Sequence, residues 1–356
     1  MPYLLSVGLF LLLSLGTAPL EIATGLALVG GLIWGDRSRT PLVAPVVAVA
    51  AVYLLSALGR PIGHLVEALG RVWPLALVVA VPMLLGGIRD ERRLGRIETA
   101  GLWSAVIAAT WAITQAIGGL LGGQELVELT AKGPFSHHLT LGYGLLPALA
   151  RAVVVRRAGM ALVLGVGVVL SGATGPVLSL VVVLFAVEAE RLGGRWAPLS
   201  PEGRGSLLAG VLGLTVCLVG LVLLRHSPEV VERGVLWGTG AVLTGDHALG
   251  VGVLGFREAA GPVQAILQPG FHFPLHAHDS ALQLSSMAGM GAWIAWGWLM
   301  LGLWREAGPG GRAALMALLV GSLTQDTLGD LEVIRALTAW VLLPEVFPRE
   351  AREPSS

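Results

Sequence analysis

The sequence has few of the residues that cover the surface of a soluble protein. Only 13% of its 356 residues are charged, whereas ordinary soluble domains have about 25%. It contains a single cysteine, Cys217, which excludes an extracellular disulfide scaffold. Its 23 basic residues are balanced by 23 acidic residues, which excludes nucleic-acid binding through excess positive charge.

Apolar residues are abundant instead. They make up 54% of the chain, and the mean hydropathy is +0.78. A soluble domain of this size cannot bury so much apolar surface, so we predict an all-α polytopic membrane protein. Each span needs roughly 20 apolar residues. The sequence offers about 12 candidate transmembrane helices, at residues 3–20, 21–35, 41–58, 72–88, 99–122, 137–155, 159–172, 174–190, 205–225, 280–304, 312–328 and 331–347.

The distribution of basic residues predicts the orientation of the chain. With both termini in the cytoplasm, most of the 23 basic residues fall on cytoplasmic connections, as the positive-inside rule requires. All 8 histidines then fall on the outer side or at outer span ends. We divide the chain into residues 1–225 (transmembrane helices 1–9), residues 226–279 (a long outer loop with short helices) and residues 280–356 (transmembrane helices 10–12 and a cytoplasmic tail).

A cluster of polar residues ends the long outer loop. The segment FHFPLHAHDSALQL contains His272, His276, His278 and Asp279. Three histidines and a carboxylate have the chemistry of a zinc site. One neutral imidazole beside a hydroxyl is suited to general base catalysis near pH 7. A polar loop with no chemical role is the third alternative, and the spacing alone does not separate the three.

The same outer loop carries arginines. In the segment EVVERGVLW, Arg233 and Trp237 fall on one face of an expected amphipathic helix, and Arg257 follows in GFREA. A guanidinium group binds phosphate through two parallel hydrogen bonds, so these arginines are candidate phosphate ligands. The alternative is an ion pair at the membrane surface with Glu232 or Glu258.

Two further outer segments are polar. Lys132, His137 and His138 lie at the outer start of the span at 137–155, where Ser136 is also a good helix cap. The segment TQDTLGDLEVIR places its carboxylates next to an arginine between the last two spans. We interpret this second group as a structural network that pairs with the outer arginines. It consists of Asp326, Asp330, Glu332 and Arg335.

Two segments of this outer region resemble a known family. The segments ERGVLWGTGAVLTGDHALGVGVLGFRE and HAHDSALQLSSMAGMGAW resemble the signature region of the O-antigen ligase and polymerase family of bacterial membrane glycosyltransferases. The resemblance covers residues 133–340, and its specific part is 233–291. The family pattern is met at Arg233, Trp237, Asp246, His247, Gly250, Gly252, Phe256, His276, His278, Leu282, Gln283 and Gly289.

The resemblance implies a GT-C-like helical fold in the bacterial inner membrane, with the active site on the periplasmic face. It implies an inverting, metal-independent glycosyl transfer that uses no cofactor. The donor would be a glycan on undecaprenyl diphosphate, and the partners would be this donor, membrane lipids and an acceptor glycolipid or glycan. The acceptor hydroxyl would lie on lipid A-core for a ligase, or on another lipid-linked chain for a polymerase.

The resemblance also implies roles for individual residues. His278 would be the general base, and Arg233 would bind the diphosphate. Because carboxylates orient catalytic histidines elsewhere, Asp279 and Asp246 are the candidates to orient His278. The expected supporting residues are His276, Trp237, Asp246, His247, His137, His138 and Asp330.

Two departures from the family pattern stand out. Asp279 replaces the usual asparagine after the base. The segment SGATGPVLSL, with Thr174 and Gly175, lacks an arginine that many members carry there. The candidate substitutes for this arginine are Arg225, Arg257 and Lys132.

Two functions of other classes remain open at the level of sequence. One is a transporter or flippase for a lipid-linked or small anionic substrate, which favours charges within spans and repeated halves. The other is a metal-dependent hydrolase that uses the histidine cluster.

Overall fold

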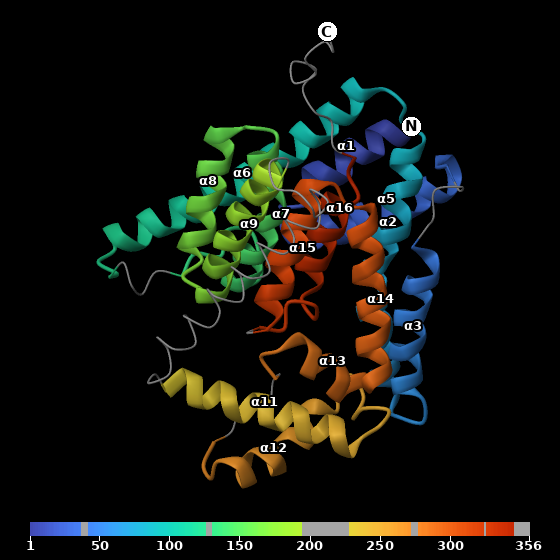
Figure 1. Ribbon diagram of the computed structural model, residues 1–356, viewed down its shortest axis with the longest axis vertical. Helices are drawn as coiled ribbons and strands as arrows, with labels where there is room; N and C mark the ends of the chain where they lie inside the picture. The colour runs from blue at the N-terminus through green and yellow to red at the C-terminus, as the bar shows by residue number, and fades with distance from the viewer. Residues whose placement is uncertain (37–41, 126–129, 194–227, 272–276, 324, 345–356) are drawn as a thin grey trace.

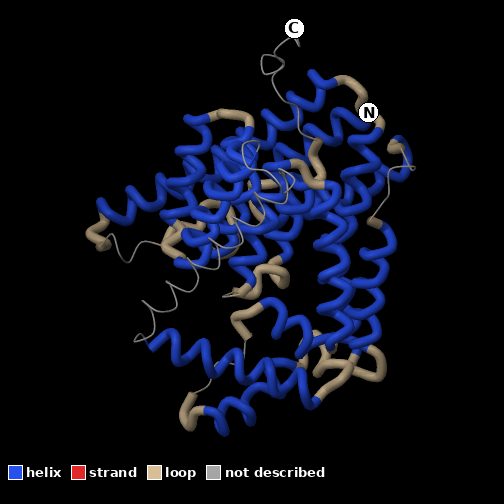
Figure 2. The backbone as a smooth tube through the Cα atoms, viewed as in Figure 1, coloured by secondary structure: helices blue, strands red, loops and turns tan. Residues whose placement is uncertain are grey.

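The computed structural model describes residues 1–36, 42–125, 130–193, 228–271, 277–323 and 325–344, and all regular secondary structure in these residues is helical (Figure 2). The predicted all-helical class is therefore confirmed for the described residues, whereas the predicted span at 205–225 lies outside them. The first half contains α1 (Pro2–Leu12), α2 (Thr17–Trp34), α3 (Val43–Ala57), α4 (Ile62–Val72), η1 (Trp73–Leu75), α5 (Ala76–Gly86), α6 (Glu91–Leu121), α7 (His138–Val154) and α8 (Ala158–Leu170). The second half contains α9 (Thr174–Gly193), α11 (Pro228–Asp246), α12 (Phe256–Leu267), α13 (Ser280–Ala288), α14 (Met290–Glu306), α15 (Pro309–Ser322) and α16 (Leu331–Val341).

Two helical segments are long and apolar enough to cross a bilayer. One is the continuous run Ile62–Gly86, formed by α4, η1 and α5, and the other is α6. The remaining apolar helices of the described chain are shorter, so the predicted number of twelve spans stays a prediction.

The central helix of the main bundle is α7, which packs against α8, α9, α15 and α16. Every residue from Thr140 to Ala152 is buried, because neighbouring helices surround it. Helices α3 and α14 pair side by side and extend toward α11, α12 and α13, which lie together at the end of the molecule opposite the N-terminus (Figure 1).

A second, smaller apolar core holds α11 and α12 against α13. Its buried side chains are Leu243, Val251, Phe256, Ala260, Ala277 and Met287. Because Ala277 adjoins His278 and Leu243 lies on α11 with Arg233, this core connects the described segments that carry the histidine and arginine motifs.

The predicted span at 280–304 is wrong as a single helix. The structure divides it at Gly289 into α13 and α14. Gly289 has φ of 77°, a left-handed conformation that favours glycine, and its Cα faces the backbone of Ala248 and Leu249. A short polar helix that begins after His278 is thus set apart from the apolar helix α14.

The predicted span at 72–88 is also too short at its beginning, because the helical run starts at Ile62. Its first part is amphipathic, and the ion pair between Arg71 and Glu67, at 3.1 Å, supports it at i, i+4 spacing. The polar residues between Ile62 and Val72 therefore lie on one face of a helix and not in a loop between two spans.

Candidate functional site

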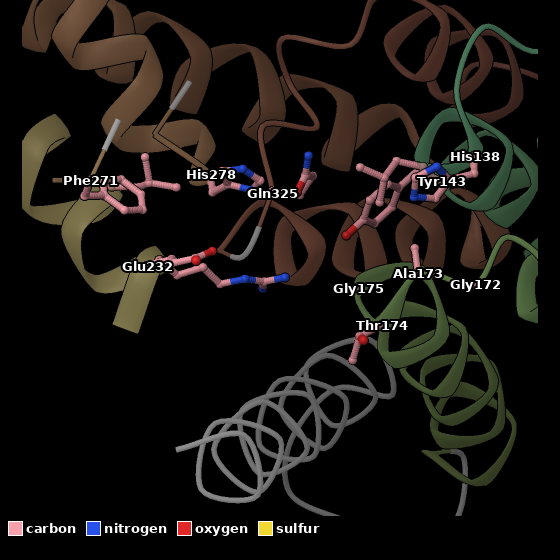
Figure 3. Close-up of a pocket in the computed structure, with 13 residues that line it drawn as sticks. His138, Tyr143, Gly172, Ala173, Thr174, Gly175, Glu232, Phe271, His278 and Gln325 are labelled. Atoms are coloured by element: carbon pink, nitrogen blue, oxygen red, sulfur yellow. Dashed lines mark hydrogen bonds between the residues drawn. The ribbon is translucent and has the colours of Figure 1, made fainter. Parts of the chain in front are cut away.

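A cavity of about 390 Å³ lies where α7, α9, α11 and three connecting segments meet. The side chains of His278, Gln325 and His138 line it, as do residues of the turn at 172–175 (Figure 3). Arg233 lines the same cavity from α11. The structure thus brings together the base and the phosphate ligand that the family resemblance implies, from segments far apart in the sequence.

His278 lies in the turn immediately before α13. Its φ of 53° is uncommon for a residue with a side chain. Two contacts hold it: its Nδ1 lies 3.0 Å from Oε1 of Gln325, and its carbonyl oxygen accepts a hydrogen bond of 3.4 Å from Nε1 of Trp237. Burial lowers the pKa of His278, the contact with Gln325 opposes this, and the charge of Arg233 lowers it further. The imidazole is therefore neutral near pH 7, as a general base requires.

Asp279 has a structural position. Its carboxylate accepts a hydrogen bond of 2.8 Å from the backbone N–H of Leu282 and so caps α13. Burial raises the pKa of Asp279, and backbone hydrogen bonds from Leu282 and Ala281 oppose the rise. The side chain that contacts the ring of His278 is Gln325, whereas the sequence suggested Asp279 for this orienting role.

Arg233 is partly buried and faces the cavity together with Glu232. Among the described residues it has no ion pair or hydrogen bond, so the structure does not contain the alternative pair with Glu232 or Glu258. A guanidinium group that no described residue pairs with, at the wall of a cavity, is well placed to bind an anion.

The wall opposite α11 is the start of α9. Gly172, with φ of 68°, turns the chain into this helix, and residues 172–175 line the cavity. Helix α9 packs closely on α7, because a Cβ atom at Gly142 would lie 2.6 Å from the ring of Pro176. No arginine stands here, but the N-terminus of a helix carries partial positive charge and unpaired N–H groups that favour anions.

Hydrogen bonds connect the loop between α15 and α16 to its neighbours. The hydroxyl of Ser280 donates to the carbonyl oxygen of Gln325 at 3.2 Å and accepts from the N–H of Leu328 at 3.1 Å. Asp330 caps α16 and accepts a hydrogen bond of 2.6 Å from the hydroxyl of Thr140 in α7. Asp330 is therefore a supporting residue that fixes the loop, and the loop in turn places Gln325 in the cavity.

The predicted ionic network pairs in part with the outer arginines, as expected, and in part with α2. Arg335 is fully buried and donates to Glu21 of α2, whose second oxygen accepts a hydrogen bond of 2.7 Å from Trp73. Asp326 is buried near Arg71; burial raises its pKa to about 6, and the positive charge of Arg71 opposes the rise. Arg335 thus forms an ion pair with a distant helix, and its positive charge also acts on Glu332 beside it in the sequence.

The predicted residues His137, His138 and Lys132 lie at or near the start of α7, and Arg257 lies on α12. His138 lines the cavity, and its ring packs 4.0 Å from that of His137, which caps α7 by accepting from the N–H of Leu139. Lys132 and Arg257 are exposed, and neither lines the cavity. Lys132 and Arg257 therefore do not lie in the cavity with Arg233.

The remaining predicted residues are remote or lie outside the described chain. Asp246 and His247 are exposed at the far end of α11, about 20 Å along the helix from Arg233 at 1.5 Å per residue. Asp246 is therefore not placed to orient His278. Arg225 and His276 lie outside the described residues. Within the described residues, no group of three or more His, Cys, Asp or Glu side chains is arranged to hold a metal ion.

Sequence reasoning missed Gln325. It stands beside Asp326 in the segment LTQDTLGDLEV, which carries part of the family resemblance. The charged neighbours drew the interpretation toward ion pairs, and a neutral amide gives no comparable signal. Only the fold shows that this loop turns Gln325 toward His278 (Figure 3).

An apolar groove of about 690 Å³ lies on the other side of the same loop. Its walls come from α13, α14 and α15, and three tryptophans, Trp293, Trp296 and Trp304, line it. Leu323 and Leu328 close it on the side of the loop that carries Gln325. A polar cavity and an apolar groove therefore share one connecting segment.

No protein-family model matches the sequence. No curated protein is significantly similar to it either. The function is therefore argued from the site and from the motifs of the sequence.

Proposed function

We propose that this protein is a membrane glycosyltransferase of the O-antigen ligase type, which moves a glycan from undecaprenyl diphosphate to the hydroxyl of an acceptor sugar. The observation that carries the proposal is that His278 and Arg233 line one cavity. One is a base that is neutral at physiological pH, and the other is a cation without a protein partner in the described chain. Transfer from a diphosphate needs both.

The surface of the helices supports a membrane location. Large apolar side chains stand exposed on separate helices, including Ile22 of α2 (63% exposed), Ile107 of α6 (52%) and Ile294 of α14 (70%). A soluble monomer rarely exposes so much apolar surface, whereas lipid covers it at no cost. We place the chain in a bacterial inner membrane as a GT-C-like bundle of about twelve spans, with cytoplasmic termini and the cavity facing the periplasm.

The two hollows fit the two halves of the donor. Arg233 and the N-terminus of α9 both line the polar cavity and offer the positive charge that a diphosphate requires. The apolar groove beside it suits a polyprenyl tail, and the loop at 323–328 would separate tail from headgroup. Arg233 and the start of α9 would thereby share the task of the family arginine that this sequence lacks.

The proposed reaction is a single displacement. The acceptor oxygen forms a bond to the anomeric carbon while the bond from that carbon to the diphosphate oxygen breaks, so the configuration inverts. The proton of the acceptor hydroxyl goes to His278, and the leaving diphosphate keeps the electron pair as a stable anion beside Arg233. General base catalysis of this kind contributes about 10²- to 10⁴-fold.

The test is elongation of an acceptor by the purified protein in nanodiscs that contain an undecaprenyl-diphosphate glycan. The variant His278→Ala is expected to lose about 10²-fold or more of the activity, while its detergent-solubilised size and thermal midpoint match those of the wild type. Lipid A-core and a second lipid-linked glycan, offered as separate acceptors, distinguish a ligase from a polymerase.

Two results would contradict the proposal. One is transfer by His278→Ala at the wild-type rate. The other is movement of the labelled glycan lipid across liposomes without elongation of either acceptor, which would identify a transporter instead.

A further inference from the structure

The contact between His278 and Gln325 fixes which ring nitrogen of the histidine carries hydrogen. Oε1 of Gln325 is only an acceptor, and it lies 3.0 Å from Nδ1 of His278. With the carboxamide oxygen facing it, Nδ1 donates, and in a neutral imidazole the other nitrogen, Nε2, then carries no hydrogen. The contact with Gln325 thus determines which nitrogen of His278, a residue that lines the cavity, can accept a proton (Figure 3).

Both partners of this contact are held independently of each other. The backbone carbonyl oxygen of Gln325 accepts hydrogen bonds from Ser280, at 3.2 Å, and from the N–H of Thr327, at 2.9 Å. The backbone of His278 is held by Trp237 at its carbonyl oxygen. Because the two backbones are fixed, the contact between the side chains sets the orientation of the ring and does not depend on a bound substrate.

We propose that Gln325 is a positioning residue for glycosyl transfer, which orients His278 through Nδ1 so that Nε2 takes the proton of the acceptor hydroxyl. This inference rests on the proposed function. In the step itself the O–H bond of the acceptor breaks and an N–H bond forms at Nε2, while the hydrogen on Nδ1 stays with Gln325.

A carboxamide in this position has a different effect from a carboxylate. A carboxylate both orients a histidine and stabilises its protonated form. Gln325 orients the ring without adding negative charge, and Arg233 adds positive charge to the same cavity. The protonated His278 is therefore weakly held and releases its proton readily after each turnover.

The experiment compares Gln325→Glu and Gln325→Ala with the wild type in nanodiscs, using two measurements. The first is modification by diethyl pyrocarbonate, which acylates unprotonated imidazole, followed at His278 by mass spectrometry as a function of pH. This measurement needs no turnover. The second is the pH profile of kcat and KM for transfer. The matched control is Gln115→Glu, whose carboxylate keeps accepting from the backbone N–H groups of Lys132 and Gly133.

Gln325→Glu is expected to move the midpoint of His278 modification upward by about 1 to 3 pH units, because a carboxylate beside the ring favours its charged form. The acid limb of kcat/KM moves in the same direction. Gln325→Ala is expected to remove the selection between the two ring nitrogens, so that modification occurs at either one, and to lower kcat by about 10²-fold through a misplaced base, with little change in KM. Gln115→Glu is expected to match the wild type in both measurements.

Wild-type midpoints and a wild-type kcat in both Gln325 variants would overturn the inference. A shifted midpoint with an unchanged kcat would also overturn it, since the contact would then be structural. If the wild-type protein elongates no acceptor, the proposed function fails and the role of Gln325 in transfer fails with it, even where the midpoint shifts as expected.

Discussion

Arg233 is a cation that the described chain leaves without a partner. On the surface of a protein such a residue is ordinary, but Arg233 is partly buried at the wall of a cavity, where loss of water strengthens its attraction for an anion. Its planar fork also distinguishes it from lysine, which binds phosphate as a single point charge. These two properties, charge and shape, can be removed separately.

We expect Arg233→Ala to reduce kcat/KM for the lipid-linked donor by about 10²- to 10³-fold, the usual effect of losing one group that stabilises a developing anion. Arg233→Lys keeps the charge and is expected to recover part of this loss. The measurement is transfer at varied donor concentration. Arg305→Ala, which removes an exposed arginine near the end of α14, is the matched control and should leave transfer unchanged. Equal and small effects of both Arg233 variants would contradict phosphate binding.

The sequence predicted part of this site at the level of residues. The motifs containing Arg233 and His278, which stood out because they resemble a family pattern, both line one cavity in the structure. It did not predict the capping role of Asp279 or the remoteness of Asp246, since residue type alone does not tell which way a carboxylate points. The sequence did not predict the contact of Gln325 either, since residue type does not tell which way an amide side chain points.

At the level of elements, the sequence predicted the bounds of several helices closely. The spans predicted at 41–58 and 137–155 agree with α3 and α7 within two residues at each end. The span at 280–304 failed because apolar content runs on through Gly289, while the helix does not. The helix breaks where Gly289 contacts the backbone at 248–249, a segment distant in the sequence. The periodicity of the sequence does not reveal such contacts.

The break at Gly289 yields a test of how α13 is positioned. We expect Gly289→Ala to destabilise the fold strongly, because φ of 77° is strained for alanine and the new Cβ meets the backbone of Ala248 and Leu249. Gly270→Ala is the matched control: its φ is 85°, but nothing lies within 4 Å of the new Cβ. Strain alone costs about 1 to 3 kcal/mol in both variants. The loss of stability should therefore be larger for Gly289→Ala than for Gly270→Ala.

The thermal midpoint in detergent measures both variants. Similar midpoints would mean that the contact with residues 248–249 has no energetic weight. Gly289→Ala could lose transfer at temperatures where the variant stays folded. This result would mean that the variant displaces α13, whose N-cap Asp279 directly follows His278. In that case Gly270→Ala should retain transfer.

At the scale of the whole molecule, the proposed function uses the two hollows and the loop between them to bind a long lipid and a polar headgroup at once. The polar cavity is formed by α7, α9 and α11, and the apolar groove by α13, α14 and α15. The loop at 323–330 lines both, and the hydrogen bonds of Ser280 and Asp330 fix it to α13, α16 and α7. A donor with only one of its two halves would therefore use only one hollow.

This arrangement predicts that filling the groove affects long-chain donors selectively. Gly297 lines the groove, and nothing lies within 4 Å of a Cβ atom built there, so Gly297→Trp places an indole in the groove without disturbing α14. We expect its KM for the undecaprenyl donor to rise by about 10-fold, on the order of 1.4 kcal/mol. For a donor with a short prenyl chain, which cannot fill the groove, KM should stay unchanged, as should kcat for both donors, because His278 and Arg233 line the other hollow.

Gly118→Trp in α6 is the matched control, since its Cβ also meets open space and the position is not part of the groove. It should use both donors like the wild type. Because the headgroup is identical in the two donors, a rise in KM for both with Gly297→Trp would mean that the indole acts on the polar cavity through the shared loop. An unchanged KM for both would place the polyprenyl tail outside the groove and leave the diphosphate site on Arg233 as the sole anchor of the donor.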